Sequence, residues 1–385
     1  MNRSTEEYRE KATEAFEMSP SRFSELLEKK AIMQDWGGHD DFFRFTTNVG
    51  RIDEGSVLVR KEDGFEVIQG FPKIKRAIML APALESHFEG ISSVIVEEKM
   101  NGYNVRVIEH KDKLVAFTRS GHVCPYSSDR ANRLLERDFF RDHPEYVVYG
   151  EMAGPDNPYV PKDIYGVDSL EFFVFDVRYK DGGTMPVHDR RKLAEEYGFT
   201  QVELLGEFKL SGAADSIREI IVELGKTEHE GVVIKDPDMV LQPLKYTSSQ
   251  SNCADLRHGF RFYNESGKDY LFARVVREGF QSVEWNESED EIRERCLRLG
   301  ESILRPMRES ILHVQGGERL WEDVRIRVTD ESTIDMFRMY LERLGLDVIF
   351  GTPERVGDEY VVNIRKMNKS TTDKTLGIIE GQLWS

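Results

Sequence analysis

The segment Glu97–Asn104, which reads EEKMNGYN, contains a lysine whose position suits covalent catalysis. Lys99 ends an apolar-rich stretch that predicts a strand, and Gly102 shortly after it permits a tight turn. Free lysine is protonated at neutral pH and is a poor nucleophile, so this role requires surroundings that favour the neutral amine. An ordinary solvated lysine before a turn has the same local pattern, and K-x-N-G alone does not separate the two interpretations.

Further charged and aromatic residues lie at predicted strand ends or turns between Lys99 and Lys245. Each segment by itself is common in proteins, because glycines at strand ends and turns are common. Their combination in one order is a much stronger signal than Lys99 alone. The segments are Arg119-Ser120-Gly121, Tyr149-Gly150-Glu151, Phe172-Phe173-Val174-Phe175-Asp176, Glu230-Gly231-Val232-Val233-Ile234-Lys235 and Leu244-Lys245-Tyr246.

In this order, the motifs resemble those of the covalent nucleotidyltransferase superfamily of ATP-dependent ligases and RNA-capping enzymes. Within it, the chain most resembles the archaeal homodimeric ATP-dependent RNA ligases. The family's lysine motif usually reads K-x-D-G, whereas this chain has Asn101 in place of the aspartate. That difference favours RNA ligases over DNA ligases. DNA ligases and capping enzymes also carry an R-x-D-K barrel motif after the core, and the sequence has no clear copy of it.

The resemblance implies a covalent bond between Lys99 and the AMP of ATP, with Glu230 and Lys245 also catalytic. Phosphate charge would be neutralised by Lys235 and Lys245. Glu230 would organise Mg²⁺ or Mn²⁺, directly or through water. Asn104 would contact the 5′-phosphate of single-stranded RNA.

The resemblance also implies a nucleotide-binding set. Glu97 would read the adenine amino group, Arg119 the ribose or phosphate, and Glu151 the ribose hydroxyls. An aromatic ring of the Phe172–Asp176 strand would stack on adenine, and Phe175 is expected there with Phe173 as its rival. The full expected set is Glu97, Met100, Asn101, Gly102, Arg119, Glu151, Phe175, Val232, Lys235 and Lys245.

Each of these residues also has an ordinary structural interpretation. Phe173 and Phe175 could belong to the core, Asn104 could begin a hairpin, and Arg119 or Lys245 could lie on surface loops. Glu151 and Glu230 could be solvated strand ends. A second basic feature is equally open. Arginines spaced by three and four residues would form one stripe on a helix, which either binds phosphate or is a solvated face paired with acids. They are Arg130, Arg133, Arg137 and Arg141.

The expected function is that of an ATP-dependent RNA ligase. Lys99 would be adenylylated, AMP would pass to an RNA 5′-phosphate, and a 3′-hydroxyl would then seal the strand, joining two ends or circularising one RNA. Two alternatives remain. One is a DNA ligase or capping-type nucleotidyltransferase, and the other is a non-catalytic nucleotide- or RNA-binding dimer.

The elements that must position these residues predict an α+β fold. The core would be an antiparallel-sheet nucleotidyltransferase domain, ATP-grasp-like in class, over residues 71–250. An N-terminal extension would occupy 1–70, a helical and dimer-forming segment 251–315, and a small α/β module 316–385. Strands are expected in 40–70, with a hairpin at Lys111–Asp112.

Helices are expected over 1–35 with Ser21 as a cap, and over four later stretches with apolar residues at helical spacing. One of these, Glu287–Ile311, is expected to break near Pro306. Its apolar stripe would serve dimerisation or pack on its own domain. The other three are Asp189–Tyr197, Asp215–Leu224 and Ser332–Leu344.

Composition narrows the class of protein further. The chain has 385 residues and a formal net charge of −17, which argues against a general nucleic-acid binder with a broad basic face. Its three cysteines are far apart, so neither a zinc site nor a disulfide framework is expected. The charged N-terminus has no apolar signal core and no stretch is long enough for a membrane span. We therefore expect a cytoplasmic protein without membrane contact.

Overall fold

The computed structural model describes residues 19–35, 39–62 and 64–383. Helix α2 (Pro20–Glu28) comes first, and the side chain of Ser19 accepts a hydrogen bond from the N–H of Arg22 at 3.3 Å. The predicted cap at Ser21 was therefore wrong by two positions, because Pro20 already occupies the first helical turn, where proline is favoured. The predicted helix also ends early, since Lys30 has a φ of 57° and a strand follows. Its first part, residues 1–18, lies outside the described residues.

A four-stranded antiparallel meander follows α2 and forms a layer of the molecule. Its strands are β1 (Ile32–Gln34), β2 (Phe42–Phe45), β3 (Val57–Lys61) and β4 (Gly64–Ile68). Phe45 and Leu58 pack beneath α2, while Val57 and Val59 point the other way and pack against the central domain. The meander is thus held on both faces.

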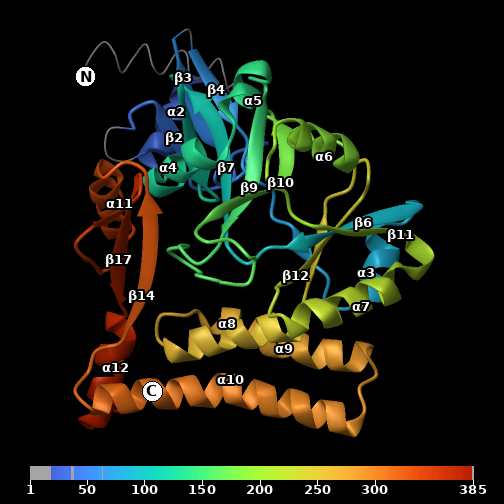
Figure 1. Ribbon diagram of the computed structural model, residues 1–385, viewed down its shortest axis with the longest axis vertical. Helices are drawn as coiled ribbons and strands as arrows, with labels where there is room; N and C mark the ends of the chain where they lie inside the picture. The colour runs from blue at the N-terminus through green and yellow to red at the C-terminus, as the bar shows by residue number, and fades with distance from the viewer. Residues whose placement is uncertain (1–18, 36–38, 63, 384–385) are drawn as a thin grey trace.

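Two sheets make up the central domain (Figure 1). The first has the order β10 (Glu171–Tyr179), β9 (Tyr146–Ala153), β7 (Tyr103–His110) and β8 (Lys113–Thr118). The second has the order β11 (Leu204–Lys209), β6 (Ser93–Lys99), β12 (Gly231–Lys235), β13 (Leu244–Thr247) and β5 (Lys75–Arg76). Neighbours are antiparallel except for the pair β13 and β5. The α+β class and the largely antiparallel core are confirmed.

Local turn chemistry explains the connection between β7 and β8. Lys111 and Asp112 have φ values of 49° and 59° and join β7 to β8, which confirms the predicted hairpin.

Three helices cover the first sheet: α4 (Pro125–Leu134), α5 (Arg137–Asp142) and α6 (Val187–Glu196). Helices α3 (Leu80–His87) and α7 (Ala213–Lys226), the latter preceded by the short η1 (Leu210–Gly212), pack on the second. The predicted helices near 189–197 and 215–224 are confirmed as α6 and α7.

A helical segment lies below the second sheet (Figure 1) and consists of α8 (Ser249–Arg261), α9 (Lys268–Glu284) and α10 (Glu289–Gln315). The break predicted near Pro306 was wrong, because α10 continues through the proline. A proline inside a helix costs about 3 kcal/mol. Here Pro306 lies on the buried face with Ser302 and Ser310, so packing offsets that cost.

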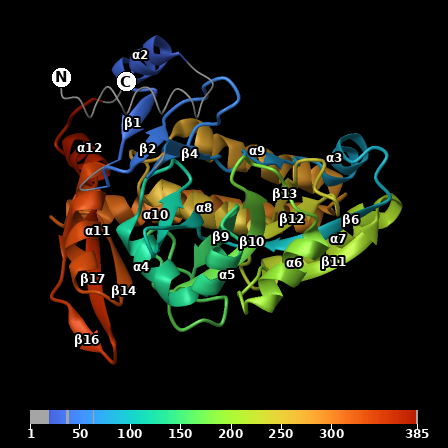
Figure 2. The ribbon, with the colours of Figure 1, turned by 90° about the horizontal axis from the view of Figure 1, so that it is seen from above.

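The C-terminal module consists of β14 (Trp321–Val328), α11 (Ser332–Arg343), β15 (Val348–Phe350), β16 (Glu354–Val356), β17 (Glu359–Met367) and α12 (Lys369–Ile379). It lies beside α4 at one end of the molecule (Figure 2). Val324, Ile326 and Phe337 continue the apolar core of the first sheet without a gap. The predicted helix over 332–344 is confirmed as α11. Within the described residues, no helix is long and apolar enough to cross a membrane.

Candidate functional site

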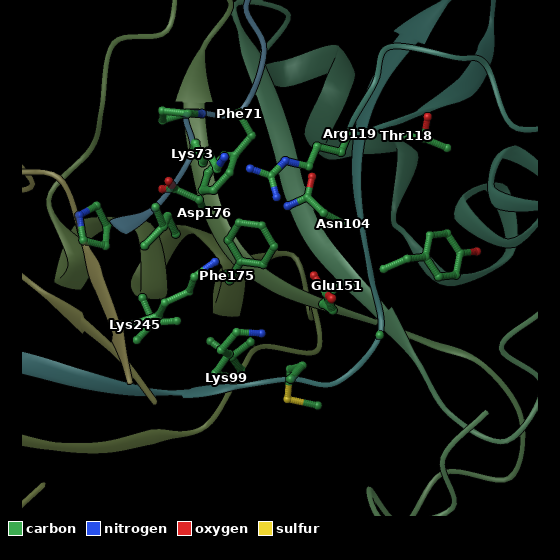
Figure 3. Close-up of a pocket in the computed structure, with 18 of the residues that line it drawn as sticks. Phe71, Lys73, Lys99, Asn104, Thr118, Arg119, Glu151, Phe175, Asp176 and Lys245 are labelled. Atoms are coloured by element: carbon green, nitrogen blue, oxygen red, sulfur yellow. The ribbon is translucent and has the colours of Figure 1, made fainter. Parts of the chain in front are cut away.

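A cavity of about 1010 Å³ lies between the two central sheets. Strand ends from both sheets border it, and Asp53 and Glu54 of the N-terminal meander and Tyr340 of α11 complete its wall. Figure 3 shows Lys99 and Lys245 on one side of Phe175, and Arg119 with Asn104 on the other. The cavity therefore gathers residues that the sequence spreads from β6 to β13.

Lys99 is the last residue of β6 and pairs with Glu230, which immediately precedes β12. Its Nζ lies 2.5 Å from Oε2 of Glu230, and the two side chains are 19% and 17% exposed. Gly102 follows in the turn to β7, where a Cβ atom would meet the carbonyl oxygen of Met152 at 2.2 Å. The motif thus needs glycine because β9 crosses so close to this turn. Lys99 therefore reaches the cavity with a carboxylate beside it that can accept the proton its amine must lose before it attacks.

Asn104 and Glu151 are direct neighbours across β7 and β9, and both line the cavity. The Oδ1 atom of Asn104 is buried and has no hydrogen-bond partner among the described residues, which is rare in folded proteins. Burial raises the pKa of Glu151 to about 7, although the nearby Lys99 opposes this shift. An unpartnered acceptor and a carboxyl group with a raised pKa in one pocket mark a binding site.

Arg119 follows β8 directly and is exposed at the cavity wall, with its side chain near Asn104 (Figure 3). Its turn packs closely on the N-terminal meander, since a Cβ atom at Gly55 would meet the carbonyl oxygen of Arg119 at 2.2 Å. The meander therefore holds this turn in place.

A β-bulge in β10 decides which phenylalanine faces the cavity. The pairing with β9 shifts between Val174 and Asp176, so Phe175 is the extra residue and both Phe175 and Asp176 line the cavity. Phe173 packs instead with Met100, in a small buried cluster. Phe71 meets Phe175 edge to face with ring centres 5.2 Å apart. The geometry thus favours Phe175 over its rival.

Glu97 belongs to a buried ion network. Its Oε2 lies 2.6 Å from Nζ of Lys235, and its Oε1 accepts hydrogen bonds from Arg190 and Arg191 of α6. Burial raises the pKa of Glu97, but the charges of Lys235 and Arg190 outweigh it and lower the value to about 2. Lys235 also donates to the carbonyl oxygen of Phe175 at 2.7 Å. Glu97 and Lys235 are thus bound to each other, and both line the cavity, so their expected roles towards adenine and phosphate stay predictions.

The face of β12 also differs from the expectation for Val232. Val232 is buried in the core on the far side of the strand, and Val233 is the valine that lines the cavity. Strand alternation places Val233 on the same face as Lys235 and Val232 on the face of Ile234, so the sequence already carried the signal that separates the two valines. Val233 stands between Glu97 and Lys245 in one cross-strand row.

Lys245 adds positive charge next to Lys99. Burial lowers the pKa of Lys245 to about 8, and the charges of Arg76, Lys99 and Arg119 lower it in the same direction. Crowded cations of this kind suit a polyanionic ligand such as a triphosphate. Asn101 lies outside the cavity lining, and its N–H donates to the hydroxyl of Tyr165 at 2.6 Å.

The predicted arginine stripe does not exist as one surface, because Leu135 and Glu136 separate α4 from α5. Its members bind carboxylates instead. Arg130 is 3% exposed and pairs with Glu359 of the C-terminal module at 2.5 Å, and Arg137 pairs with Glu109 at 2.7 Å. Arg133 and Arg141 pair with Asp358 and Asp138.

Several residues that shape the site carry no signal in the sequence. Arg190 and Arg191 belong to a surface-like helix pattern, and their pairing with Glu97 depends on how α6 packs. Phe71 and Tyr340 come from loops and modules outside the recognised motifs. A contact between residues so far apart in the chain leaves no local pattern.

Comparison with known proteins shows the family to which the chain belongs. A family model described as RNA ligase matches residues 92–247, and one described as the ligase Pab1020 C-terminal region matches residues 258–382. A solved structure described as archaeal ATP-dependent RNA ligase, form 1, is 40% identical over 97% of this chain and 98% of that chain, with a TM-score of 0.90. The chain belongs to the archaeal ATP-dependent RNA ligase family.

Two other relatives show how far the likeness extends. The Methanocaldococcus jannaschii protein MJ0414, described as uncharacterized, is 35% identical over 97% of this chain and 96% of its own length. A structure from Aquifex aeolicus, provisionally named an ATP-dependent DNA ligase, is 24% identical with a TM-score of 0.87 over 95% of this chain and all of its own. This second likeness shows the fold alone. The similarity to the archaeal RNA ligase structure covers 97% of this chain, and so it includes the N-terminal meander and the C-terminal module as well as the central domain.

Proposed function

We propose that this chain is an ATP-dependent RNA ligase that works through an AMP adduct on Lys99. The observation that carries the proposal is the position of Lys99 in the cavity, paired with Glu230 and surrounded by Arg119, Glu151 and Lys245. Adenine would stack on Phe175, and the ribose hydroxyls would meet Glu151.

In the first step, the Lys99 amine attacks the α-phosphorus of ATP. A P–N bond forms, the bond to the β-phosphate oxygen breaks, and pyrophosphate leaves. Lys245 and Arg119 stabilise the charge that develops on the phosphate oxygens. Glu230, at 2.5 Å from Nζ, accepts the amine proton that must leave.

In the second step, an oxygen of the RNA 5′-phosphate attacks the AMP phosphorus and the P–N bond breaks. Asn104 and Arg119 lie together at the wall opposite Lys245, where they would bind this phosphate (Figure 3). The side-chain amide nitrogen of Asn104 would donate a hydrogen bond to this phosphate. Its unpartnered Oδ1 would accept a hydrogen bond from another group of the ligand or from water. A 3′-hydroxyl then attacks the activated 5′-phosphate and AMP leaves.

The carboxylates beside Lys99 also fit a single divalent cation. Within residues 19–35, 39–62 and 64–383, no three or more His, Cys, Asp or Glu side chains gather into a metal-binding group. Glu230 and Glu151 are close enough to affect each other's charge, and Mg²⁺ commonly binds through one or two carboxylates, waters and substrate phosphates. Bound Mg²⁺ or Mn²⁺ would neutralise phosphate charge.

The proposal is tested by mass spectrometry of the Lys99 peptide after incubation with ATP and magnesium, and by ligation of 5′-phosphorylated single-stranded RNA. We expect added AMP on Lys99, its absence in Lys99→Ala, and circular or joined RNA as product. An adduct that persists in Lys99→Ala would exclude this mechanism.

Substrate choice is tested in the same assay. GTP in place of ATP, and DNA ends in place of RNA ends, should give much less adduct and much less product. Efficient sealing of DNA, or transfer from GTP, would instead indicate a DNA ligase or capping-type enzyme. Absence of any adduct under all conditions would indicate a non-catalytic binding protein.

We also propose that the protein forms a homodimer through α10. Leu297, Leu304 and Ile311 are spaced by seven residues and are 65%, 62% and 38% exposed, so they form one apolar line on the outer face of the helix. Such a line is typical of a helix that packs on a second helix. The stripe identified in the sequence, Ile292 to Met307, lies at the edge of this face, and the fully buried face carries Arg295, Ser302 and Pro306 instead.

A further inference from the structure

Three arginines gather where α9 of the helical segment packs under the second sheet: Arg76 from β5, and Arg274 and Arg277 from α9. The contact between the two elements is direct, because Gln281 of α9 donates to the carbonyl oxygen of Thr247 at 3.2 Å, and Arg76 donates to the hydroxyl of the same threonine at 2.8 Å. At this junction the three guanidinium groups are close enough for their charges to act on one another.

This cluster carries more positive than negative charge. Arg274 is paired with Asp255, at 2.8 and 2.7 Å from its two nitrogens, whereas Arg76 and Arg277 donate to neutral groups, the Thr247 hydroxyl and the Asn252 amide oxygen at 3.2 Å. Burial lowers the pKa of Arg277 to about 10, and the charges of Arg76 and Arg274 act in the same direction. In a chain of net charge −17, like charges held together at partial burial are stabilised when an anion binds.

The cluster adjoins the cavity without lining it. Among the neighbouring charges, that of Arg76 acts most strongly on Lys245, which does line the cavity, and Arg76 also feels Glu230 beside Lys99. At the outer end, the Arg274 guanidinium lies over the Tyr270 ring at 3.3 Å from its centre, and Tyr270 is 42% exposed. Positive charge thus continues from the cavity to an aromatic side chain at the surface.

We propose that Arg76, Arg274 and Arg277 bind backbone phosphates of the RNA strand as it leaves the cavity past Lys245, with Tyr270 as a platform for one base. A basic track with an exposed aromatic ring is how single-stranded nucleic acid is commonly held. The released pyrophosphate is a less suitable ligand, because it leaves from the cavity, which none of these arginines lines. This inference rests on the proposed ligase function and adds to it a binding site from the helical segment.

The test uses the full chain with Arg76→Gln and Arg277→Gln made separately, since both arginines donate to neutral groups and neither substitution strips a carboxylate of a hydrogen-bonded cation. Binding of 5′-phosphorylated single-stranded RNA is followed by fluorescence anisotropy at several salt concentrations without ATP. Each variant should raise Kd about tenfold at low salt, as expected for a lost charged contact, and reduce the slope of log K against log salt by about 0.7.

The matched control is Arg293→Ala, which removes an arginine that is 78% exposed on α10 and paired with Asp290, and which should keep the wild-type slope. Unchanged RNA affinity and slope in both glutamine variants would overturn the inference. So would slower Lys99 adenylylation by ATP with RNA binding intact, because that result would assign the arginines to the nucleotide phosphates.

The two proposals fail in different ways. Wild-type protein that is never adenylylated would contradict the ligase mechanism, and arginine-dependent RNA binding in that protein would still support this site. If one variant does not fold, thermal unfolding reveals it and the other variant supplies the comparison.

Discussion

Glu151 lines the cavity, and its neighbours shift its pKa in opposite directions. Burial disfavours its charged form and raises its pKa to about 7, while Lys99 and Arg119 act in the opposite direction. A ribose hydroxyl and a nearby cation would both favour the charged form once the nucleotide is bound. In the free protein, the Glu151 carboxyl group is therefore only partly ionised near neutral pH. Bound nucleotide would stabilise its charged form.

Glu151→Gln should stabilise the free protein at pH 8. The pKa in the folded state is about 7 and lies above the value in the unfolded state, so the folded protein binds more protons and loses stability as pH rises from about 4.5 to 7. Glutamine cannot ionise and escapes this loss, which is on the order of 1–3 kcal/mol. Urea unfolding at pH 5 and pH 8 measures it.

The gain should vanish near pH 5, where the wild-type carboxyl group is protonated. Glu309→Gln, at an exposed position of α10, is the matched control and should show no pH-dependent difference. ATP binding should weaken in Glu151→Gln despite its greater stability. Equal effects of the substitution at pH 5 and pH 8 would contradict the raised pKa.

At the scale of elements, the loop between β2 and β3 supports the turn that carries Arg119. Gly55 has a φ of 83°, and its carbonyl oxygen accepts a hydrogen bond from the buried Arg106 of β7. The carbonyl oxygen of Gln69, just after β4, accepts from Arg106 and from the Tyr149 hydroxyl, both at 3.1 Å. The N-terminal meander is thus joined to the first sheet by polar contacts beside the site.

Gly55→Ala should raise the KM for ATP in the adenylylation step several-fold. Its Cβ atom would lie 2.2 Å from the carbonyl oxygen of Arg119, so the turn must move. Gly50→Ala is the control, because Gly50 also has a positive φ of 60°, but a methyl group there would meet no atom within 4 Å beyond its chain neighbours. Backbone strain should lower the free energy of unfolding of both variants by about 1 kcal/mol. The clash with Arg119 should lower that of Gly55→Ala further.

Kinetics and urea unfolding of the two variants separate local displacement from general strain. If both alanine variants show the same KM for ATP, the meander does not position Arg119.

At the scale of the whole molecule, the exposed line on α10 and the acidic surface act in opposite directions. The net charge of −17 keeps copies of the chain apart at low salt, whereas burial of Leu297, Leu304 and Ile311 against a second copy would bring them together. The cavity is lined by strands of the two central sheets, and α8 and α9 lie between α10 and these sheets (Figure 1), so dimerisation through the outer face of α10 would leave the cavity open.

Leu304→Asp should convert a dimer into a monomer in light scattering after size-exclusion chromatography. A carboxylate at the middle of the apolar line would be desolvated twice in a symmetric contact, once from each copy. Leu383→Asp changes a leucine that is 93% exposed in the segment after α12, outside the apolar line, and should leave the dimer intact. A dimer that persists in Leu304→Asp would place the interface elsewhere.

The order of the motifs, through the family that it resembles, predicted much of the site. Lys99, Asn104, Arg119, Glu151, Phe175 and Lys245 were all expected to meet, and all line one cavity. All but Phe175, which lies in the middle of β10, are at or near a strand end or turn, and these features depend on neighbouring residues. The α+β class was predictable for the same reason.

Tertiary structure decided the remaining features. The bulge in β10 selected Phe175 over Phe173, packing of α6 placed Arg190 on Glu97, and the C-terminal module placed Glu359 on Arg130. Pro306 stays within α10 because its neighbours are buried there. These outcomes depend on which distant segments of the chain pack together, because that packing sets charge pairing and strand register. The local pattern of residue types does not specify which distant segments meet.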